Sequence, residues 1–336
     1  MTCRPYSSLN PLTSAFLMNS SASQPQEGAS LACERSRFGS LRRMMGRITV
    51  AFVLDKEKGR ENGSAAPAAR LLPGRCQADL GAGREAWDRL TRVGEYARFY
   101  WGVGFFWVAS LFWSVVSGLL SLLLPPRLGA RVGQFLIMVG FRLFLSHMRL
   151  LGLFRCDLTA LDRLRNEGPL LIAANHPALL DAVLVISRLP RVVCLTKAEL
   201  WGNPFLGGCL RLARYLRSDS PLLLVREAKE AIRRGEQILI FPEGTRTTTE
   251  PVSSFKGGVA VIGRVTGIPV QTVFLEGNFP YLAKGWPLFR KPQFPLVYRA
   301  RLGRRFLAQG EPHAFVEELE RYYRQELARS PSISVR

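Results

Sequence analysis

The chain has 336 residues, is 47% hydrophobic and carries a formal net charge of +20 at pH 7. A chain of this length and apolar content can bury a sizeable core, which excludes a protein that is disordered throughout. The positive charge predicts an anionic partner, either nucleic acid or an anionic membrane surface, unless it is only a solvated basic surface. Because the sequence has no helix-turn-helix, zinc-finger or RNA-binding aromatic signature, we favour the membrane and expect no nucleic-acid partner.

The six cysteines are scattered, without a C-x-x-C pair or a cluster with the three histidines. This spacing predicts neither a zinc site nor a disulfide framework, so we expect free thiols and no bound metal. Cys194 and Cys209 lie in apolar stretches, where we expect them to pack as small hydrophobic side chains.

The first 92 residues are predicted to be a disordered extension. They are rich in Ser, Gly, Ala, Pro and Arg and contain only brief apolar runs. Such a composition cannot bury enough apolar surface to offset the entropy lost on ordering. The start of the chain also lacks the basic, apolar and small-residue order of a secretory signal.

Residues 93–154 are predicted to form a membrane-embedded or interfacial pair of helices. Residues 99–124 contain no charged side chain, and a helix of that length reaches about 39 Å, beyond the roughly 30 Å of a bilayer core. Pro125 and Pro126 end this helix, and arginines on both sides give it no preferred orientation under the positive-inside rule. A helix that dips into one leaflet and returns fits as well as a single span. Residues 132–154 have the amphipathic spacing of an interfacial helix, with an ordinary core helix as the alternative.

Beyond Asp157 apolar runs alternate with helical patterns, which predicts an α/β fold with a mostly parallel central sheet flanked by helices. The expected strands cover residues 169–174, 191–196, 237–241, 269–275 and 296–302. The expected helices are one that begins near 177 and others over 203–212, 221–234 and 312–328.

The first chemical motif is N-H-P-A-L-L-D, residues 175–181, directly after an apolar run. Proline favours the first position of a helix and disfavours a helical residue before it, so Pro177 predicts that His176 projects from a loop. Asp181 can then reach back and orient the imidazole, which can remove a proton from a hydroxyl. The alternative is a histidine that is simply satisfied within the core.

The second motif is F-P-E-G-T-R, residues 241–246, which also follows an apolar run. Gly244 allows close backbone approach, Thr245 offers a hydroxyl, and Arg246 can bind phosphate oxygens bidentately. Glu243 cannot bind phosphate favourably, so we expect it to orient Arg246 or a backbone donor. A surface turn with an incidental salt bridge is the alternative.

Taken together, the two motifs resemble those of the glycerolipid acyltransferases, the group of lysophosphatidic acid acyltransferase and related lysophospholipid acyltransferases. The resemblance covers roughly residues 95–310 and includes K-A-E-L at 197–200 and N-P-F-L-G at 203–207. It implies a catalytic domain over residues 155–310, followed by a C-terminal helix and tail over 311–336. It also implies a membrane-bound O-acyltransferase on the cytoplasmic face, which transfers an acyl group from acyl-CoA or acyl carrier protein to a lysophospholipid and needs no cofactor.

The default acceptor that this resemblance implies is 1-acylglycerol-3-phosphate, which would yield phosphatidic acid. The implied catalytic residues are His176 and Asp181. The expected substrate-binding residues are Asn175, Lys197, Arg217, Glu243, Gly244, Thr245 and Arg246. The stretch 212–217 lacks the glycine usual in the family, and Val273 replaces a common proline. These departures keep other acceptors open, such as a lyso-ornithine lipid, a glycolipid or a specialised lipid, and a catalytically inactive lipid-binding protein is a further alternative.

Overall fold

The computed structural model describes residues 74–249, 251–278 and 281–329, with side chains from residue 89 onward. It divides into two compact units, Met1–Ala82 and Gly83–Arg336. The architecture, the site and the contacts of the protein described below all belong to the second unit.

The predicted disordered extension falls mostly on residues 1–73, which lie outside the described residues. The structure has no boundary at the predicted position near residue 92, because helix α2 (Gly74–Leu123) continues through it without a break. Residues 84–92 are mainly Arg, Glu, Ala and Leu, which are strong helix formers, and no proline interrupts them. Helix propensity therefore places the start of the helix earlier than the change in hydrophobicity does.

Two long helices precede the sheet, α2 and α3 (Pro126–Leu150), and Pro125 separates them. By length and composition alone, Arg89–Leu123 and α3 are long and apolar enough to cross a membrane. Only 11% of the most apolar window of α2 is buried, against 44% for α3. The predicted helical pair is therefore present and suggests membrane association, and α3 is in addition a packed helix of the domain.

Helix α3 packs tightly against the domain at Gly133. A Cβ added at this glycine would lie 2.8 Å from the backbone nitrogen of Ala213, which follows helix α5 (Gly207–Leu212). The neighbouring Gln134 donates from Nε2 to the Ala213 carbonyl at 3.2 Å. A side chain at position 133 would push the helix away, so glycine permits the close approach.

Seven strands form one sheet in the order β1-β7-β6-β2-β5-β3-β4, and every neighbouring pair is parallel except β6 with β7. The strands are β1 (Phe154–Asp157), β2 (Leu171–Ala174), β3 (Val192–Thr196), β4 (Leu216–Arg217), β5 (Gln237–Ile240), β6 (Val270–Gly277) and β7 (Leu296–Phe306). The predicted α/β class and mostly parallel sheet are confirmed. The two edge strands, β1 and β4, were not predicted, because each has few residues and includes an arginine.

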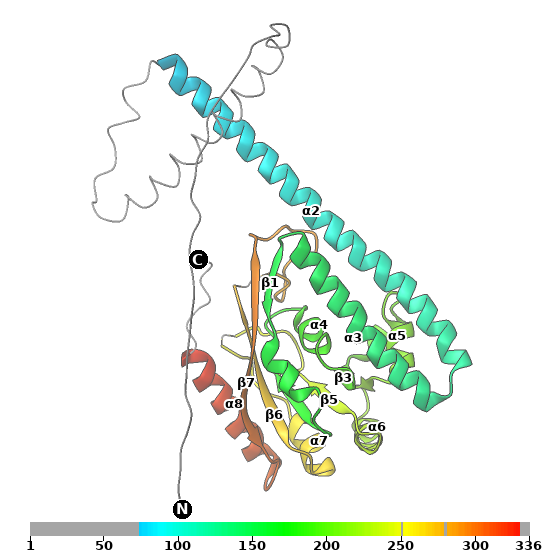
Figure 1. Ribbon diagram of the computed structural model, residues 1–336. Coiled ribbons are helices and arrows are strands. Elements are labelled where there is room, and N and C mark those ends of the chain that lie inside the picture. The colour runs from blue at the N-terminus through cyan, green and yellow to red at the C-terminus, as the bar shows by residue number, and fades with distance from the viewer. Residues whose placement is uncertain (1–73, 250, 279–280, 330–336) are drawn as a thin grey trace, which may run out of the picture. The chain divides into compact units, whose positions relative to one another are not determined.

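Helices cover both faces of the sheet, and Figure 1 shows α3 and α4 on one side and α8 on the other. After α3 the helices are η2 (Thr159–Leu164), α4 (Asp181–Ile186), η3 (Ala198–Gly202), α5, α6 (Pro221–Arg233), α7 (Gly258–Thr266) and α8 (Pro312–Arg329). The helix expected from residue 177 begins only at Asp181, and of the helix expected over 203–212 only α5, Gly207–Leu212, is helical. Helix α6 starts as expected, with the Ser220 hydroxyl accepting the Leu223 N–H at 3.4 Å.

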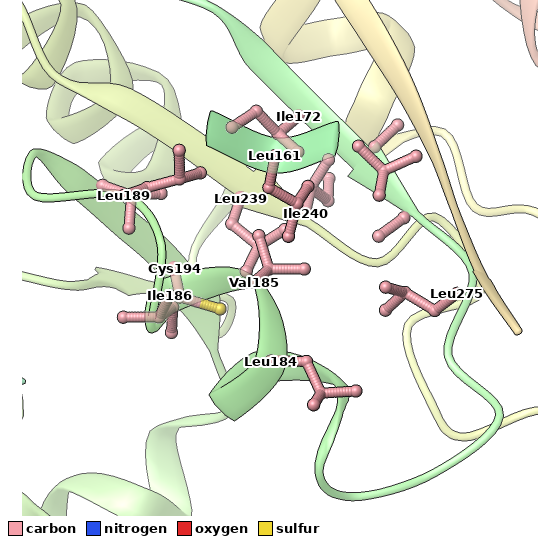
Figure 2. Packing of buried hydrophobic residues seen from close by; sticks show 14 of the residues in the cluster. Leu161, Ile172, Leu184, Val185, Ile186, Leu189, Cys194, Leu239, Ile240 and Leu275 are labelled. Atoms are coloured by element: carbon pink, nitrogen blue, oxygen red, sulfur yellow. The ribbon is translucent and has the colours of Figure 1, made fainter. Parts of the chain in front are cut away.

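The central strands β2 and β5 are buried along their whole length, and β3 is buried over its first three residues. Their side chains pack with those of η2 and α4 in the hydrophobic core, where Ile172, Leu239 and Ile240 meet Leu161 and Val185 (Figure 2). Because β2, β5, β3 and β4 are parallel, their carboxyl ends meet at one edge of the sheet. In open α/β sheets this edge is where ligands bind.

Candidate active site

Four of the predicted site segments follow the carboxyl ends of adjacent parallel strands. The N-H-x4-D motif follows β2, the F-P-E-G-T-R motif follows β5, Lys197 follows β3, and Arg217 ends β4. The sheet order places β2 beside β5, and β3 and β4 beyond β5. The two motifs therefore lie together, with Lys197 and Arg217 one and two strands further along the same edge.

His176 and Asp181 form a hydrogen-bonded pair. The imidazole Nδ1 and the carboxylate Oδ2 are 2.8 Å apart, and the Asp181 side chain is fully buried while 16% of the His176 side chain is exposed. The Ala178 N–H donates to the same carboxylate oxygen at 2.7 Å. Burial raises the pKa of Asp181, and the hydrogen bonds to His176 and Ala178 partly offset that rise.

The Ala178 hydrogen bond also explains why the helix after His176 starts late. The Asp181 carboxylate binds a backbone N–H three residues before it, so residues 177–180 form turns and α4 begins with Asp181 itself. The predicted position of Pro177 as the first helical residue is therefore wrong. His176 nevertheless lies outside the helix, as predicted, and its Nδ1 faces the carboxylate.

The His176 ring is fixed from a second side by Phe241. The two rings stack with centroids 4.1 Å apart and planes inclined by 20°. No hydrogen bond to Nε2 is formed by the described part of the chain, and the ring is partly exposed. Nε2 is thus the nitrogen that can meet a substrate.

The Glu243 side chain of the second motif is hydrogen-bonded to the first motif. Its carboxylate is 1% exposed and accepts hydrogen bonds from the His176 N–H at 2.8 Å, the Thr247 hydroxyl at 2.9 Å and the Ser253 N–H at 2.8 Å. The Thr247 N–H in turn donates to the His176 carbonyl at 2.7 Å. This geometry fits the expectation that Glu243 holds a backbone donor, and it places the carboxylate in the support of the His176 loop rather than on a substrate-facing surface.

Asn175 is likewise placed in the scaffold. It is 3% exposed, its Nδ2 donates to the Leu275 carbonyl at 3.0 Å, and its Oδ1 accepts the Leu275 N–H at 2.7 Å. The side-chain amide therefore extends the pairing of β2 with β6 by one step. Both amide atoms are engaged with backbone, so the structure does not present Asn175 to a ligand.

Arg246 is half-buried beside this loop. Its Nη1 donates to the carbonyls of Leu282 and Ala283 at 3.0 and 3.1 Å. Its Nε and Nη2 form no hydrogen bond with the described residues, so one edge of the guanidinium is available to an anion. Thr245 is partly exposed next to it.

Gly244 adopts a φ of +65°, which favours glycine. A Cβ added there would lie 2.7 Å from Cδ and 3.0 Å from Nζ of Lys256, so the lysine side chain lies directly over the turn. Lys256 is a second cation at this motif that the sequence reasoning missed. Its only signal is its place in the F-K-G-G stretch that follows the motif, ten residues after Arg246.

The remaining two predicted cations differ in their partners. Lys197 is exposed at the end of β3. Arg217 binds both carboxylate oxygens of Asp219 and lies 5.6 Å from the centroid of the Trp201 ring. No contact brings Lys197 or Arg217 to the His176 pair within the described ranges, and no group of three or more His, Cys, Asp or Glu side chains there could hold a metal ion.

A histidine oriented by a buried carboxylate can take a proton from a hydroxyl, and a nearby arginine with a free edge can hold an anionic group. On an α/β fold that carries two long apolar helices, such a site is suited to a group-transfer reaction on a hydroxyl. Comparison with known proteins shows which proteins this chain is similar to. Residues 155–276 of this chain match the Acyltransferase family model.

Several relatives are similar to this chain. The 1-acyl-sn-glycerol-3-phosphate acyltransferase of Pseudomonas aeruginosa is 26% identical over 212 residues, which are 61% of this chain and 79% of the relative. The human 1-acyl-sn-glycerol-3-phosphate acyltransferase beta is 26% identical over 191 residues, which are 55% and 67% of the two chains. Mouse lysophospholipid acyltransferase LPCAT4 is 32% identical over 136 residues, which are 38% of this chain and only 25% of the mouse protein.

A solved structure has the same fold. The crystal structure of the 1-acyl-sn-glycerophosphate (LPA) acyltransferase PlsC from Thermotoga maritima matches with a TM-score of 0.53 and 21% sequence identity. The match covers 73% of this chain and 99% of that one. At this identity the likeness concerns the fold.

Proposed function

We propose that the protein is a membrane-bound O-acyltransferase that transfers a fatty acyl group from acyl-CoA or acyl carrier protein to the free hydroxyl of a lysophospholipid. The acceptor we propose is 1-acylglycerol-3-phosphate, and the product is phosphatidic acid. The observation that carries the proposal is the His176–Asp181 pair, with its free Nε2, on the same sheet edge as the free side of Arg246.

The proposed reaction needs no enzyme-bound acyl intermediate. His176 Nε2 takes the proton of the acceptor hydroxyl while its oxygen attacks the thioester carbonyl carbon. The tetrahedral intermediate then expels the thiolate, which takes the proton from the imidazolium and leaves as a thiol. Asp181 holds Nδ1 and stabilises the positive charge that His176 carries between the two proton transfers.

Two cations support a phosphorylated acceptor in this proposal. Arg246 offers two N–H groups on its free edge, and Lys256 lies over the neighbouring Gly244. A phosphate monoester carries more negative charge than the phosphodiester of other lysophospholipids, and two nearby cations favour the more highly charged group. Relatives named as 1-acyl-sn-glycerol-3-phosphate acyltransferases are consistent with this choice.

We place the reaction at the cytoplasmic face of a membrane, where acyl thioesters are available. The two apolar helices would hold the domain there, and the net charge of +20 favours an anionic lipid surface. Lys197 and Arg217, further along the sheet edge, are proposed to contact the donor or the acceptor rather than the reacting atoms.

The test is acyl transfer by the full chain in lipid vesicles, with acyl-CoA and either 1-acylglycerol-3-phosphate or a lysophospholipid without a phosphate monoester. Wild-type protein should form phosphatidic acid, and His176→Ala should lower kcat by roughly 10²- to 10⁴-fold without loss of folding. A His176→Ala rate within tenfold of wild type would refute the role of the base. Faster transfer to the other acceptor would replace the proposed substrate, and binding of lipid without transfer to any acceptor would indicate an inactive lipid-binding protein.

A further inference from the structure

The segment between β6 and β7 supplies the partners of Arg246. Residues 281–295 of this connection are called the β6–β7 segment here. The Arg246 Nη1 donates to the carbonyls of Leu282 and Ala283, two consecutive residues of the segment. These two bonds determine which edge of the guanidinium remains for a ligand.

Leu282 holds an unusual backbone conformation at this point. Its φ is +59°, in the left-handed region that residues other than glycine, asparagine and aspartate rarely adopt. Its side chain is only 6% exposed, so packing keeps the residue in place. Unfavourable backbone geometry that is held by surrounding contacts is common at functional sites.

The Leu282 carbonyl also contacts the first motif. It accepts the Leu179 N–H at 3.1 Å in addition to Arg246 Nη1 at 3.0 Å. One backbone oxygen therefore connects the loop that carries His176 with the arginine of the second motif.

The β6–β7 segment also contacts helix α2. Phe99 is fully buried, and its ring lies 6.0 Å from that of Tyr281 and 5.8 Å from that of Phe294. Lys291 forms an ion pair with Glu95 at 2.5 Å. The Tyr100 hydroxyl donates to the Phe289 carbonyl at 3.2 Å. One short stretch of α2, residues 95–100, thus contacts both ends of the β6–β7 segment.

We propose that the β6–β7 segment is a positioning element that sets the geometry of Arg246 according to its contact with α2, with Leu282 and Phe99 as its positioning residues. The inference rests on the proposed function, in which Arg246 binds the acceptor phosphate. In this arrangement α2 contributes to acceptor recognition as well as to membrane association. Loss of the Phe99 ring contacts or of the Lys291–Glu95 ion pair should make the backbone at Leu282 more mobile and allow the Arg246 guanidinium to turn away from the acceptor.

The experiment compares Phe99→Ala and Lys291→Ala with Val108→Ala in the full-length protein. Val108 is on the same helix and 71% exposed, so its truncation removes apolar surface without touching the segment. The first readout is hydrogen exchange of the Leu179 amide, whose acceptor is the Leu282 carbonyl. Exchange should be faster in the Phe99 and Lys291 variants and unchanged in the Val108 variant. This readout needs no turnover, so it separates the inference from the proposed function.

The second readout is the KM for 1-acylglycerol-3-phosphate and for acyl-CoA. Phe99→Ala should raise the acceptor KM by roughly fivefold or more and change the donor KM by less than about twofold, because only the Arg246 contact is weakened. In an Arg246→Lys background the same change should have little further effect. Lys291→Ala keeps the aromatic packing and serves where Phe99→Ala folds poorly.

Equal losses for donor and acceptor, or effects that add fully to those of Arg246→Lys, would overturn the proposal. Unchanged Leu179 exchange in both variants would do so as well. If wild-type protein transfers no acyl group to the phosphorylated acceptor while Leu179 exchange responds as expected, the proposed acceptor fails and the link from α2 to the site stands.

Discussion

Glu243→Gln removes one acceptor oxygen from a buried carboxylate that serves three donors, the His176 N–H, the Thr247 hydroxyl and the Ser253 N–H. Glutamine has the same shape, but its NH₂ group must face either the His176 side or the Ser253 side. In either orientation one buried backbone N–H meets another donor and loses its partner. An unsatisfied buried donor costs about 1–3 kcal/mol, so the free energy of unfolding should fall by that amount.

The assay is urea unfolding in detergent micelles, followed by tryptophan fluorescence. The urea concentration at the midpoint of unfolding should fall. The slope m of the unfolding free energy against urea concentration should stay the same, because the surface exposed on unfolding does not change. Glu318→Gln is the matched control, since its side chain is 52% exposed in an ion pair with Arg304 and its loss should cost less than about 1 kcal/mol. A Glu243→Gln protein within about 0.5 kcal/mol of wild type would refute the buried support role.

Three further changes test the site itself. Asp181→Asn should lower kcat by up to roughly 10⁴-fold, because an amide cannot stabilise the imidazolium; a loss below tenfold in acyl-transfer assays would contradict this. Arg246→Lys should lower kcat/KM for the phosphorylated acceptor by roughly 10- to 150-fold, because lysine cannot bind two phosphate oxygens as the guanidinium does. An equal loss of kcat/KM for the acyl donor would show that Arg246 does not bind the acceptor phosphate specifically. Lys256→Gln should raise the acceptor KM by about 2- to 5-fold, as expected for an exposed charge. If the acceptor KM of this variant depends on salt as strongly as that of the wild type, Lys256 does not contact the acceptor phosphate.

The fold was largely predictable because its central strands are short apolar runs that end at polar motifs. β2, β5 and β3 are buried, and such strands are recognised from composition alone. Helix α7 was not predicted, since its sequence G-V-A-V-I-G-R-V-T combines glycines with β-branched residues that have low helix propensity. There, packing against β2 and α8 outweighs the local preference.

The site was predictable where its residues are close in sequence. His176 and Asp181 are five positions apart, and the expected pairing is what the structure contains. The partners of Asn175 and Arg246 are backbone groups of Leu275, Leu282 and Ala283, and any residue type has those groups. Only the order of the strands brings them together, so no reading of side-chain identity could have found them.

The unequal burial of the first two helices has a practical consequence for handling the protein. Helix α3 packs closely on the domain at Gly133, whereas most of the apolar side of α2 is bare. In water that bare side would drive molecules to associate through α2, while the domain with α3 would remain folded. A detergent belt would need to cover chiefly α2 and the exposed apolar side chains of α3, and a purification that loses this belt should give soluble aggregates of native domains rather than unfolded protein.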